Sequence, residues 1–312
     1  MSEPKKSGSR EDRKTRLTVL VALSANLLIA VAKAIGGLIA TSPALLSEAA
    51  HSVADSLNEV FLLAALHRSR RPADRQHPFG YGKERFFWSL LAAVGIFVMG
   101  GCFSFFQGFE ALTQPAAKES HTGYVVGLVV LGVALLAEGA SLIRAVLQVR
   151  AQPGKGIGSD PALRTVLAED STAVLGVLLA AGGMVLHMVT GDIVWEASAS
   201  LAIGVLLVFV AYRLGKSARE QLIGEAVDPE LRAGILEFLD EQQEIDYVAS
   251  LYTMRLGMDS TLVAARVDLT PGIDSERLEL VSERIKDAIQ DHWPEADQVF
   301  LDVVEVPQRV RD

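Results

Sequence analysis

Cysteine is almost absent from this chain, and several common motifs are missing altogether. The single cysteine, Cys102, excludes an intrachain disulfide and a zinc site made of cysteines, and its apolar surroundings favour a small side chain packed in a helix. No HExxH motif is present, which argues against a zinc-dependent hydrolase, and we do not expect an enzyme. Residues 1–16 are polar and contain no short apolar run before a cleavage site, so no removable signal peptide is expected.

Basic residues are scarce toward the C-terminal end. Residues 217–312 carry 22 acidic and 9 basic side chains, a net charge of −13, whereas residues 1–216 have a net charge of +4. Nucleic-acid phosphates attract proteins of the opposite sign. We therefore expect no nucleic acid among the partners of this protein.

Half of all residues in the chain are hydrophobic, the mean hydropathy is +0.31, and long apolar stretches dominate the first two thirds. A helix needs roughly 20 apolar residues to cross the hydrocarbon core of a bilayer. The pattern predicts an α-helical membrane protein with six transmembrane helices embedded in a lipid bilayer. The expected spans are Leu17–Ala40, Ala44–Leu66, Phe86–Leu112, Tyr124–Leu147, Ala162–Val189 and Ile193–Leu214.

The distribution of Lys and Arg predicts the orientation in the membrane. These residues concentrate in the N-terminal tail and in the loops after the second and fourth spans, while the other three loops contain only Lys118. Positively charged loops stay in the cytoplasm, so both termini are expected there. The short first, third and fifth loops suit a bacterial inner membrane.

Five segments describe the expected organisation. They are a cytoplasmic N-terminal tail (1–16), a six-helix membrane domain (17–214), a linker (215–227), a cytoplasmic domain (228–306) and a short C-terminal tail (307–312).

The cytoplasmic domain has the pattern of a small α+β fold. Helical spacing covers residues 231–241 and 275–291, and alternating apolar residues predict strands at 248–255, 261–269 and 298–306. The order α-β-β-α-β leaves one face of a three-stranded sheet uncovered. Because fewer than 100 residues bury little core, a second copy of the chain is expected to pack on this face or at the edge of the sheet.

A stripe of ionisable residues runs along the second apolar stretch. Glu48, His51, Asp55 and Glu59 recur every three or four residues and share one helix face. One interpretation is a face that hydrogen-bonds to neighbouring helices. That interpretation explains a histidine and three carboxylates poorly, because ionisable groups inside a membrane are costly and mark functional sites.

Other ionisable residues occur in the remaining stretches. Glu169 and Asp170 are adjacent in the fifth, and only one of two adjacent helical residues faces a given site squarely. Together with His51 and Asp55, such a carboxylate is suited to hold a divalent cation. Supporting polar or proton-linked roles are expected for Asn26, Glu48 and Glu138, and Lys33 either snorkels or neutralises a buried carboxylate.

The histidines outside this stripe give weaker signals. Asp74 and His77 lie in the second loop beside Pro78, and two interpretations remain open, a tight metal-binding loop and a basic connector against anionic headgroups. The remaining histidines are expected at the surface. They are His67, His121, His187 and His292.

Three runs of sequence resemble the cation diffusion facilitator family. They are Ser42-Pro-Ala-Leu-Leu-Ser-Glu-Ala-Ala-His-Ser-Val-Ala-Asp-Ser, Arg71-Pro-Ala-Asp-Arg-Gln-His-Pro-Phe-Gly-Tyr-Gly and Leu167-Ala-Glu-Asp-Ser-Thr-Ala-Val-Leu-Gly. The resemblance extends from Leu17 to Val306. It implies a homodimer of six-helix protomers with ferredoxin-like cytoplasmic domains that exports Zn²⁺ from the cytoplasm in exchange for protons, without any further cofactor.

The resemblance also implies which residues bind the metal. His51, Asp55 and Asp170 match the family's principal site, but Val166 stands where a fourth ligand is usual, as in the branch that contains the mitochondrial zinc transporter 9. Glu169 or water is expected to complete the coordination sphere. In the loop, Tyr81 replaces a ligand histidine, so a metal site at Asp74 and His77 is expected to be weak or absent.

Histidine nitrogen and carboxylate oxygen suit Zn²⁺, and Mn²⁺, Fe²⁺ and Co²⁺ accept the same donors. Metal binding requires deprotonated ligands, which links it to protons. Two other functions remain open from the residues. One is a metal-regulated channel or uniporter, and the other is an interaction protein whose polar helix faces are structural.

Overall fold

The computed structural model describes residues 8–113, 121–150, 161–258 and 260–305. The outermost residues of the two expected tails, including 307–312, lie outside these ranges. Internal contacts divide the chain into two units. The first consists of Met1–Leu63 and Ser89–Lys216, and the second of Ala64–Trp88 and Ser217–Asp312.

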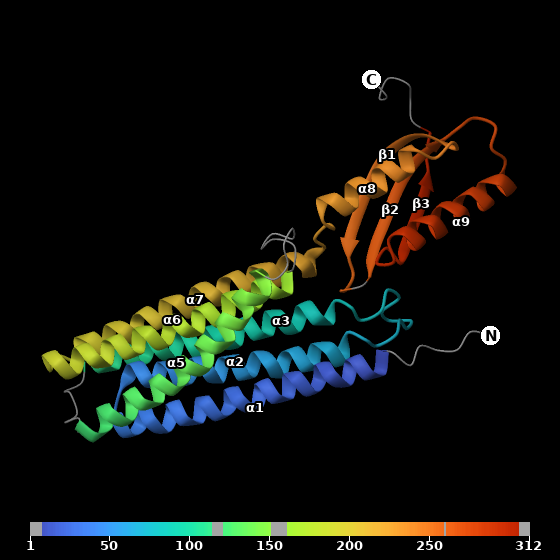
Figure 1. Ribbon diagram of the computed structural model, residues 1–312. Helices are drawn as coiled ribbons and strands as arrows, with labels where there is room; N and C mark the ends of the chain where they lie inside the picture. The colour runs from blue at the N-terminus through green and yellow to red at the C-terminus, as the bar shows by residue number, and fades with distance from the viewer. Residues whose placement is uncertain (1–7, 114–120, 151–160, 259, 306–312) are drawn as a thin grey trace. The chain divides into compact units, whose positions relative to one another are not determined.

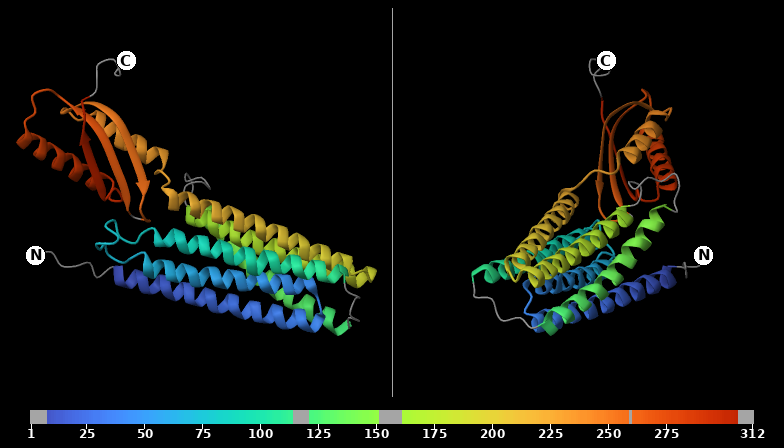
Figure 2. Two further views of the ribbon diagram at one scale, coloured as in Figure 1. Left: turned by 180° about the vertical axis from the view of Figure 1, so that it is seen from behind. Right: turned by 60° about the vertical axis from the view of Figure 1, so that its left-hand side comes forward.

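Long helices make up the first unit and lie side by side in Figures 1 and 2. A π-helix, η1, joins α3 to α4 without a break. Residues 215–223, expected within a linker, continue α7. The helices are α1 (Gly8–Ala40), α2 (Pro43–Arg68), α3 (Glu84–Gly95), η1 (Ile96–Cys102), α4 (Phe103–Thr113), α5 (His121–Arg150), α6 (Pro161–Thr190) and α7 (Val194–Ile223).

Five of the described helical segments are long and apolar enough to cross a membrane. They lie in α1, in α3 to α4, in α5, in α6 and in α7. The helix expected over Ala44–Leu66 forms as α2, with 26 residues, but it is not among the five. Its ionisable stripe lowers its hydropathy. The protein is therefore a multi-pass membrane protein, with five of the six expected spans supported by composition.

Small residues allow close contact between the third span and α7. A Cβ atom added at Gly100 would lie 2.8 Å from Leu207 Cδ1, and one at Gly108 would lie 2.7 Å from Leu201 Cγ. Such small residues let membrane helices approach closely, where dispersion contacts replace the missing hydrophobic driving force. Cys102, expected to be packed, is instead exposed. A lipid-facing surface accepts such an apolar side chain at no cost.

The second unit contains a three-stranded sheet of order β1-β2-β3, with β1 antiparallel and β3 parallel to β2. The elements follow the expected order α-β-β-α-β. They are α8 (Pro229–Asp240), β1 (Ile245–Arg255), β2 (Thr261–Leu269), α9 (Ser275–His292) and β3 (Gln298–Val303). Asp274 caps α9 by accepting a hydrogen bond from the backbone N–H of Arg277 at 2.8 Å.

One face of this sheet is covered by the two helices. Ile235 and Leu239 of α8 and Ile285 and Ile289 of α9 are fully buried against the strands. On the opposite face, Tyr252, Ala264 and Phe300 are neighbours across the three strands, and Tyr252 is 63% exposed. This row lies on the sheet face that neither helix covers, the uncovered sheet face expected from the sequence, and among the described residues the ring of Phe79 from the α2–α3 loop contacts it.

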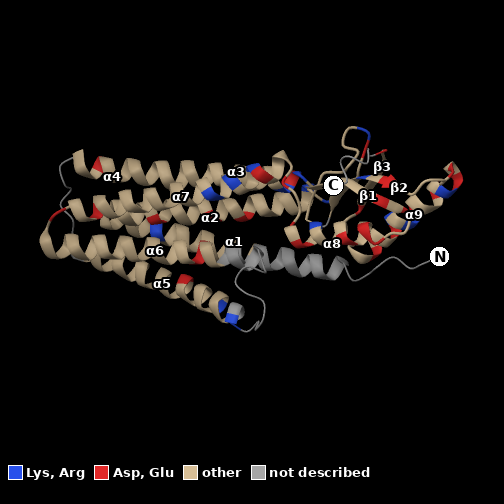
Figure 3. Cartoon of the chain, turned by 90° about the horizontal axis from the view of Figure 1, so that it is seen from above, with Lys and Arg blue, Asp and Glu red and all other residues tan. Residues whose placement is uncertain are grey.

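The loop between α2 and α3 belongs to the second unit by its contacts. The ring of Phe79 meets that of Phe300 edge to face with 6.4 Å between centroids. A Cβ atom at Gly82 would lie 3.0 Å from Gly257 Cα, so the backbones approach more closely there than a side chain permits. Acidic and basic residues are sparse along the long helices and more frequent in α8 and α9, as Figure 3 shows.

Candidate metal site in the membrane helices

His51 and Asp55 form the centre of the candidate site on α2. They lie one helical turn apart, with His51 Nε2 3.6 Å from Asp55 Oδ2. His51 is only 4% exposed, and among the described residues neither of its ring nitrogens has a hydrogen-bond partner. A buried imidazole without partners is a costly arrangement unless a ligand completes it. A neutral imidazole next to a carboxylate offers the donor types that Zn²⁺ prefers.

The two acidic residues of α6 face different neighbours. Ser141 of α5 donates a hydrogen bond to Asp170 Oδ2 at 2.9 Å, and Asn58 of α2 donates one to Glu169 Oε1 at 3.1 Å. Asp55 interacts electrostatically with both carboxylates. Adjacent residues point about 100° apart on a helix, which explains the split.

The structure therefore brings His51 together with Asp55, and the carboxylates of α6 stand nearby with partners of their own. Within the described ranges, no three His, Cys, Asp or Glu side chains are grouped closely enough to hold a metal ion. For Asp170 to complete the ligand set that the resemblance implies, its side chain must turn away from Ser141. For Val166, the structure describes only the backbone, which lies within α6.

Next to this site, Lys33 of α1 is fully buried between two carboxylates. Its ammonium donates hydrogen bonds to Glu48 Oε2 at 2.9 Å and Glu138 Oε1 at 2.8 Å. A third bond reaches Ser52 Oγ at 3.0 Å. Lys33 thus pairs with residues of α2 and α5 instead of snorkelling. The spacing in the sequence gave no indication that both carboxylates share one lysine.

Asn26 has a separate partner. Its amide donates a hydrogen bond to Glu59 Oε1 at 2.9 Å, which joins α1 to the end of the ionisable stripe on α2. Asn26 therefore contacts the stripe through Glu59 and not through Glu48.

The sequence pattern did not predict a second buried pair of ionisable residues. His187, expected at the surface, is 6% exposed, and its Nδ1 lies 2.8 Å from Glu196 Oε1. Ser42 donates a hydrogen bond to the other oxygen of Glu196, and the ring of Tyr124 stands edge to face with the imidazole. The expectation was wrong because His187 near the end of α6 and Glu196 near the start of α7 satisfy each other in a buried position. The proximity of the two residues in the sequence was the available signal.

In the α2–α3 loop, Asp74 organises the backbone. Its Oδ1 accepts hydrogen bonds from the backbone N–H groups of Gln76 and His77, both at 2.8 Å, and its Oδ2 accepts one from Tyr81 Oη at 2.7 Å. The Tyr81 hydroxyl, followed by the His77 amide, lowers the pKa of Asp74, and the same bond to Asp74 raises the pKa of Tyr81. His77 packs against the Tyr81 ring. Asp74 and His77 are adjacent, but both Asp74 oxygens are already engaged.

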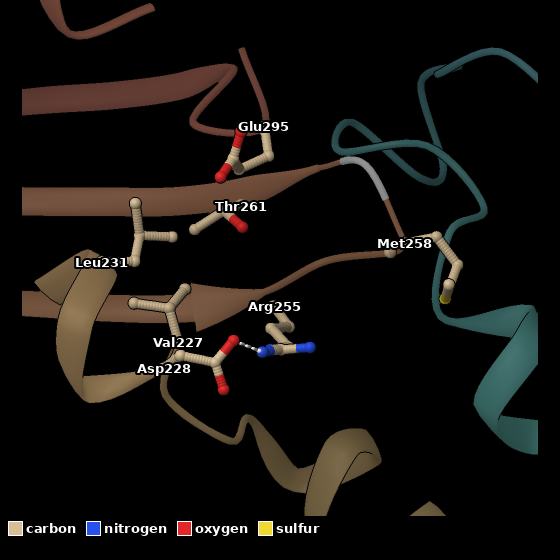
Figure 4. Close-up of a pocket in the computed structure, with 8 residues that line it drawn as sticks. Val227, Asp228, Leu231, Arg255, Met258, Thr261 and Glu295 are labelled. Carbon is tan, nitrogen blue, oxygen red and sulfur yellow. Dashed lines mark hydrogen bonds and ion pairs between the residues drawn. The ribbon is translucent and has the colours of Figure 1, made fainter. Parts of the chain in front are cut away.

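The second unit contains a partly open cavity of about 250 Å³ (Figure 4). Asp228 and Arg255 point toward each other at its edge and form an ion pair of 2.5 Å. Thr261 and Glu295 add polar groups to the lining, which contains no histidine. Because Asp228 and Arg255 satisfy each other, Glu295 is the remaining charged residue of this lining.

Comparison with known proteins identifies relatives of the chain. Residues 19–223 match the family described as the cation efflux transmembrane domain. The chain is 34% identical over 266 residues to metal tolerance protein C4 of Arabidopsis thaliana, which covers 82% of this chain and 58% of that protein. It is 31% identical over 259 residues to the proton-coupled zinc antiporter SLC30A9, mitochondrial, of Homo sapiens, covering 80% and 45%.

A bacterial relative matches over almost its full length. The manganese efflux system protein MneP of Bacillus subtilis is 24% identical over 327 residues, which covers 95% of this chain and 97% of that protein. By contrast, the chain spans about half the length of the plant and human relatives. The names of the human and bacterial relatives describe transport, in agreement with the expectation that the chain is not an enzyme.

Proposed function

Because the chain belongs to the cation efflux family, we propose that it carries a divalent metal ion, foremost Zn²⁺, out of the cytoplasm in exchange for protons. The observation that carries this proposal is the buried His51 beside Asp55, with both imidazole nitrogens lacking a hydrogen-bond partner among the described residues. Structural polar groups in a membrane helix are normally satisfied by neighbours. His51 is prepared for a ligand instead.

The proposed metal site consists of His51, Asp55 and Asp170, with Glu169 or water as the fourth ligand. Two carboxylates and a neutral imidazole balance a divalent charge in a medium of low dielectric constant. Zn²⁺, Mn²⁺, Fe²⁺ and Co²⁺ all accept such donors, so ligand type selects only broadly. Two relatives are named for zinc and for manganese, which supports this range.

Transport then proceeds by alternating access. Helices around a site near the middle of the membrane rock between two arrangements, and the site faces each side in turn. In one of these two arrangements, Asp170 breaks its hydrogen bond with Ser141 and binds the metal. Protons compete with the metal for the same ligands, so their exchange can drive export.

The proposed assembly has α2 as a sixth span, both termini in the cytoplasm and a bacterial inner membrane as its location. The ionisable stripe of α2 faces other helices, which removes the cost of exposing these residues to lipid. A homodimer forms through the uncovered sheet face with Tyr252 and Phe300. Both aromatic side chains are typical of interface cores. The loop residues Asp74 and His77 bind metal weakly or not at all.

Metal flux into proteoliposomes tests this function. Purified protein is reconstituted, and the entry of Zn²⁺, Mn²⁺, Fe²⁺ and Co²⁺ is followed with an indicator inside the vesicles. We expect saturable flux that falls to background in Asp55→Ala and persists in Asp287→Ala, the same change at an exposed position of α9. Equal flux in Asp55→Ala and the wild type would refute the site, and flux without saturation would indicate a channel.

A further inference from the structure

The cluster of Lys33, Glu48 and Glu138 has an unbalanced charge. One ammonium contacts two carboxylates, at 2.9 Å and 2.8 Å, so the ionised cluster has a net charge of −1. Lys33 and Glu48 are fully buried, and the side chain of Glu138 is 15% exposed. An uncompensated charge inside a membrane is expensive, and such groups bind a proton or another cation instead.

Each carboxylate also retains an oxygen without a hydrogen-bond partner among the described residues. These are Glu48 Oε1 and Glu138 Oε2, both buried. Lys33 cannot satisfy them, since it already donates three hydrogen bonds, which is the capacity of an ammonium group. A single proton on one of these carboxylate oxygens turns it into a hydrogen-bond donor and makes the cluster neutral.

Among the residues that the structure describes, no other charged partner neutralises the cluster from the neighbouring helices. The residues that act on it electrostatically are His51 and Asp55 of the same α2 helix. From α6, the residue that faces Glu48 is Gly176, whose missing side chain leaves space for Glu48 Oε1. The acidic pair Glu169 and Asp170 of α6 lies further along that helix and would add negative charge.

We propose that this cluster is a proton site separate from the metal site, and that it holds one proton while the metal site is empty. Glu48 lies three residues before His51 on α2, a spacing that places two Cβ atoms about 5–6 Å apart. A divalent ion that binds at His51 and Asp55 therefore lies close to the cluster and repels the proton held there. The cluster then loses its proton, and its net charge of −1 offsets part of the metal charge. This proposal rests on the proposed metal transport.

Proton release upon metal binding tests the separation of the two sites. Isothermal titration of the whole protein in detergent, in two buffers with different ionisation enthalpies, gives the number of protons released for each Zn²⁺ bound. Glu138→Gln keeps an oxygen for Lys33 and makes the cluster neutral without a proton. We expect the variant to bind Zn²⁺ within tenfold of the wild-type affinity and to release about one proton fewer.

A matched control and a second variant complete this test. Glu110→Gln makes the same change on α4 and should release as many protons as the wild type. If Glu138→Gln fails to fold, Glu48→Gln is the second variant, and it should also release about one proton fewer than the wild type for each Zn²⁺ bound. An unchanged proton count in folded glutamine variants that bind Zn²⁺ would overturn the separate proton site and leave metal transport intact. A wild type that binds none of the four metals would overturn both proposals.

Discussion

Gly176 permits α6 to approach the buried Glu48. A Cβ atom at this position would overlap Glu48 Oε1, and Glu48 has no exposed surface through which it can move away. The same carboxylate is held at its other oxygen by Lys33. A single methyl group at Gly176 would therefore displace a residue that organises three helices.

Gly176→Ala should lower the stability of the protein by about 1–3 kcal/mol, the usual cost of overpacking. The control is Gly182→Ala on the same helix, where no described atom lies within 4 Å of the added Cβ. Alanine is a better helix former than glycine by about 1 kcal/mol, so the control should be neutral or more stable. Thermal unfolding in detergent measures both. Equal melting temperatures would mean that Glu48 is not confined by α6.

At the scale of elements, the ends of α6 and α7 are joined by a buried pair of ionisable residues. His187 bonds to Glu196 at 2.8 Å, and Glu196 also accepts a hydrogen bond from Ser42 where α2 begins. Three helices are thereby connected at one end of the bundle. Removing one partner leaves a buried polar atom of the other without its hydrogen bond.

His187→Ala should therefore destabilise the protein by about 1–3 kcal/mol, the cost of leaving a buried polar group without its hydrogen bond. His67→Ala, at an exposed position in the last turn of α2, serves as the control and should change little. Thermal unfolding of both variants in detergent gives the comparison. A His187→Ala protein as stable as the His67→Ala protein would contradict the role of this pair.

The α2–α3 loop provides a prediction about pH. Because the pKa of Asp74 is lowered from 3.8, its carboxylate stabilises the loop above this value, and the stabilisation is lost as the pH falls through the lower pKa. Tyr81→Phe removes the largest cause, so the pKa of Asp74 should rise toward 3.8. A ¹³C NMR titration of the carboxyl group measures it. An unchanged pKa would show that Tyr81 does not hold Asp74.

The same elements show what the sequence can predict. The apolar stretches are long, and the spacing along α2 reports one helix face, so the helices and the polar stripe follow from the pattern. The pattern does not report which helices face each other. The contacts of Lys33 with Glu48 and Glu138 span 15 and 105 residues, and they depend on tertiary packing. The role of Asp74 depends on loop backbone geometry, which no periodicity encodes.

For the whole molecule, dimerisation through the open sheet face is the prediction to test. Tyr252→Asp should convert a dimer to a monomer, because it places a charge in the centre of an apolar contact. Leu280→Asp is the control, since Leu280 is 69% exposed on α9, away from that face. Light scattering of the full chain in detergent gives the mass. A dimer that persists in Tyr252→Asp would place the interface elsewhere.

The most direct test of the central claim, metal export coupled to protons through the site on α2 and α6, is a simultaneous recording of Zn²⁺ entry and lumenal pH in proteoliposomes. The wild type should show Zn²⁺ entry with matching proton exit. Asp55→Ala should abolish both, since it removes a carboxylate ligand beside His51. Zn²⁺ entry without any proton movement, or coupled exchange that survives in Asp55→Ala, would contradict the account.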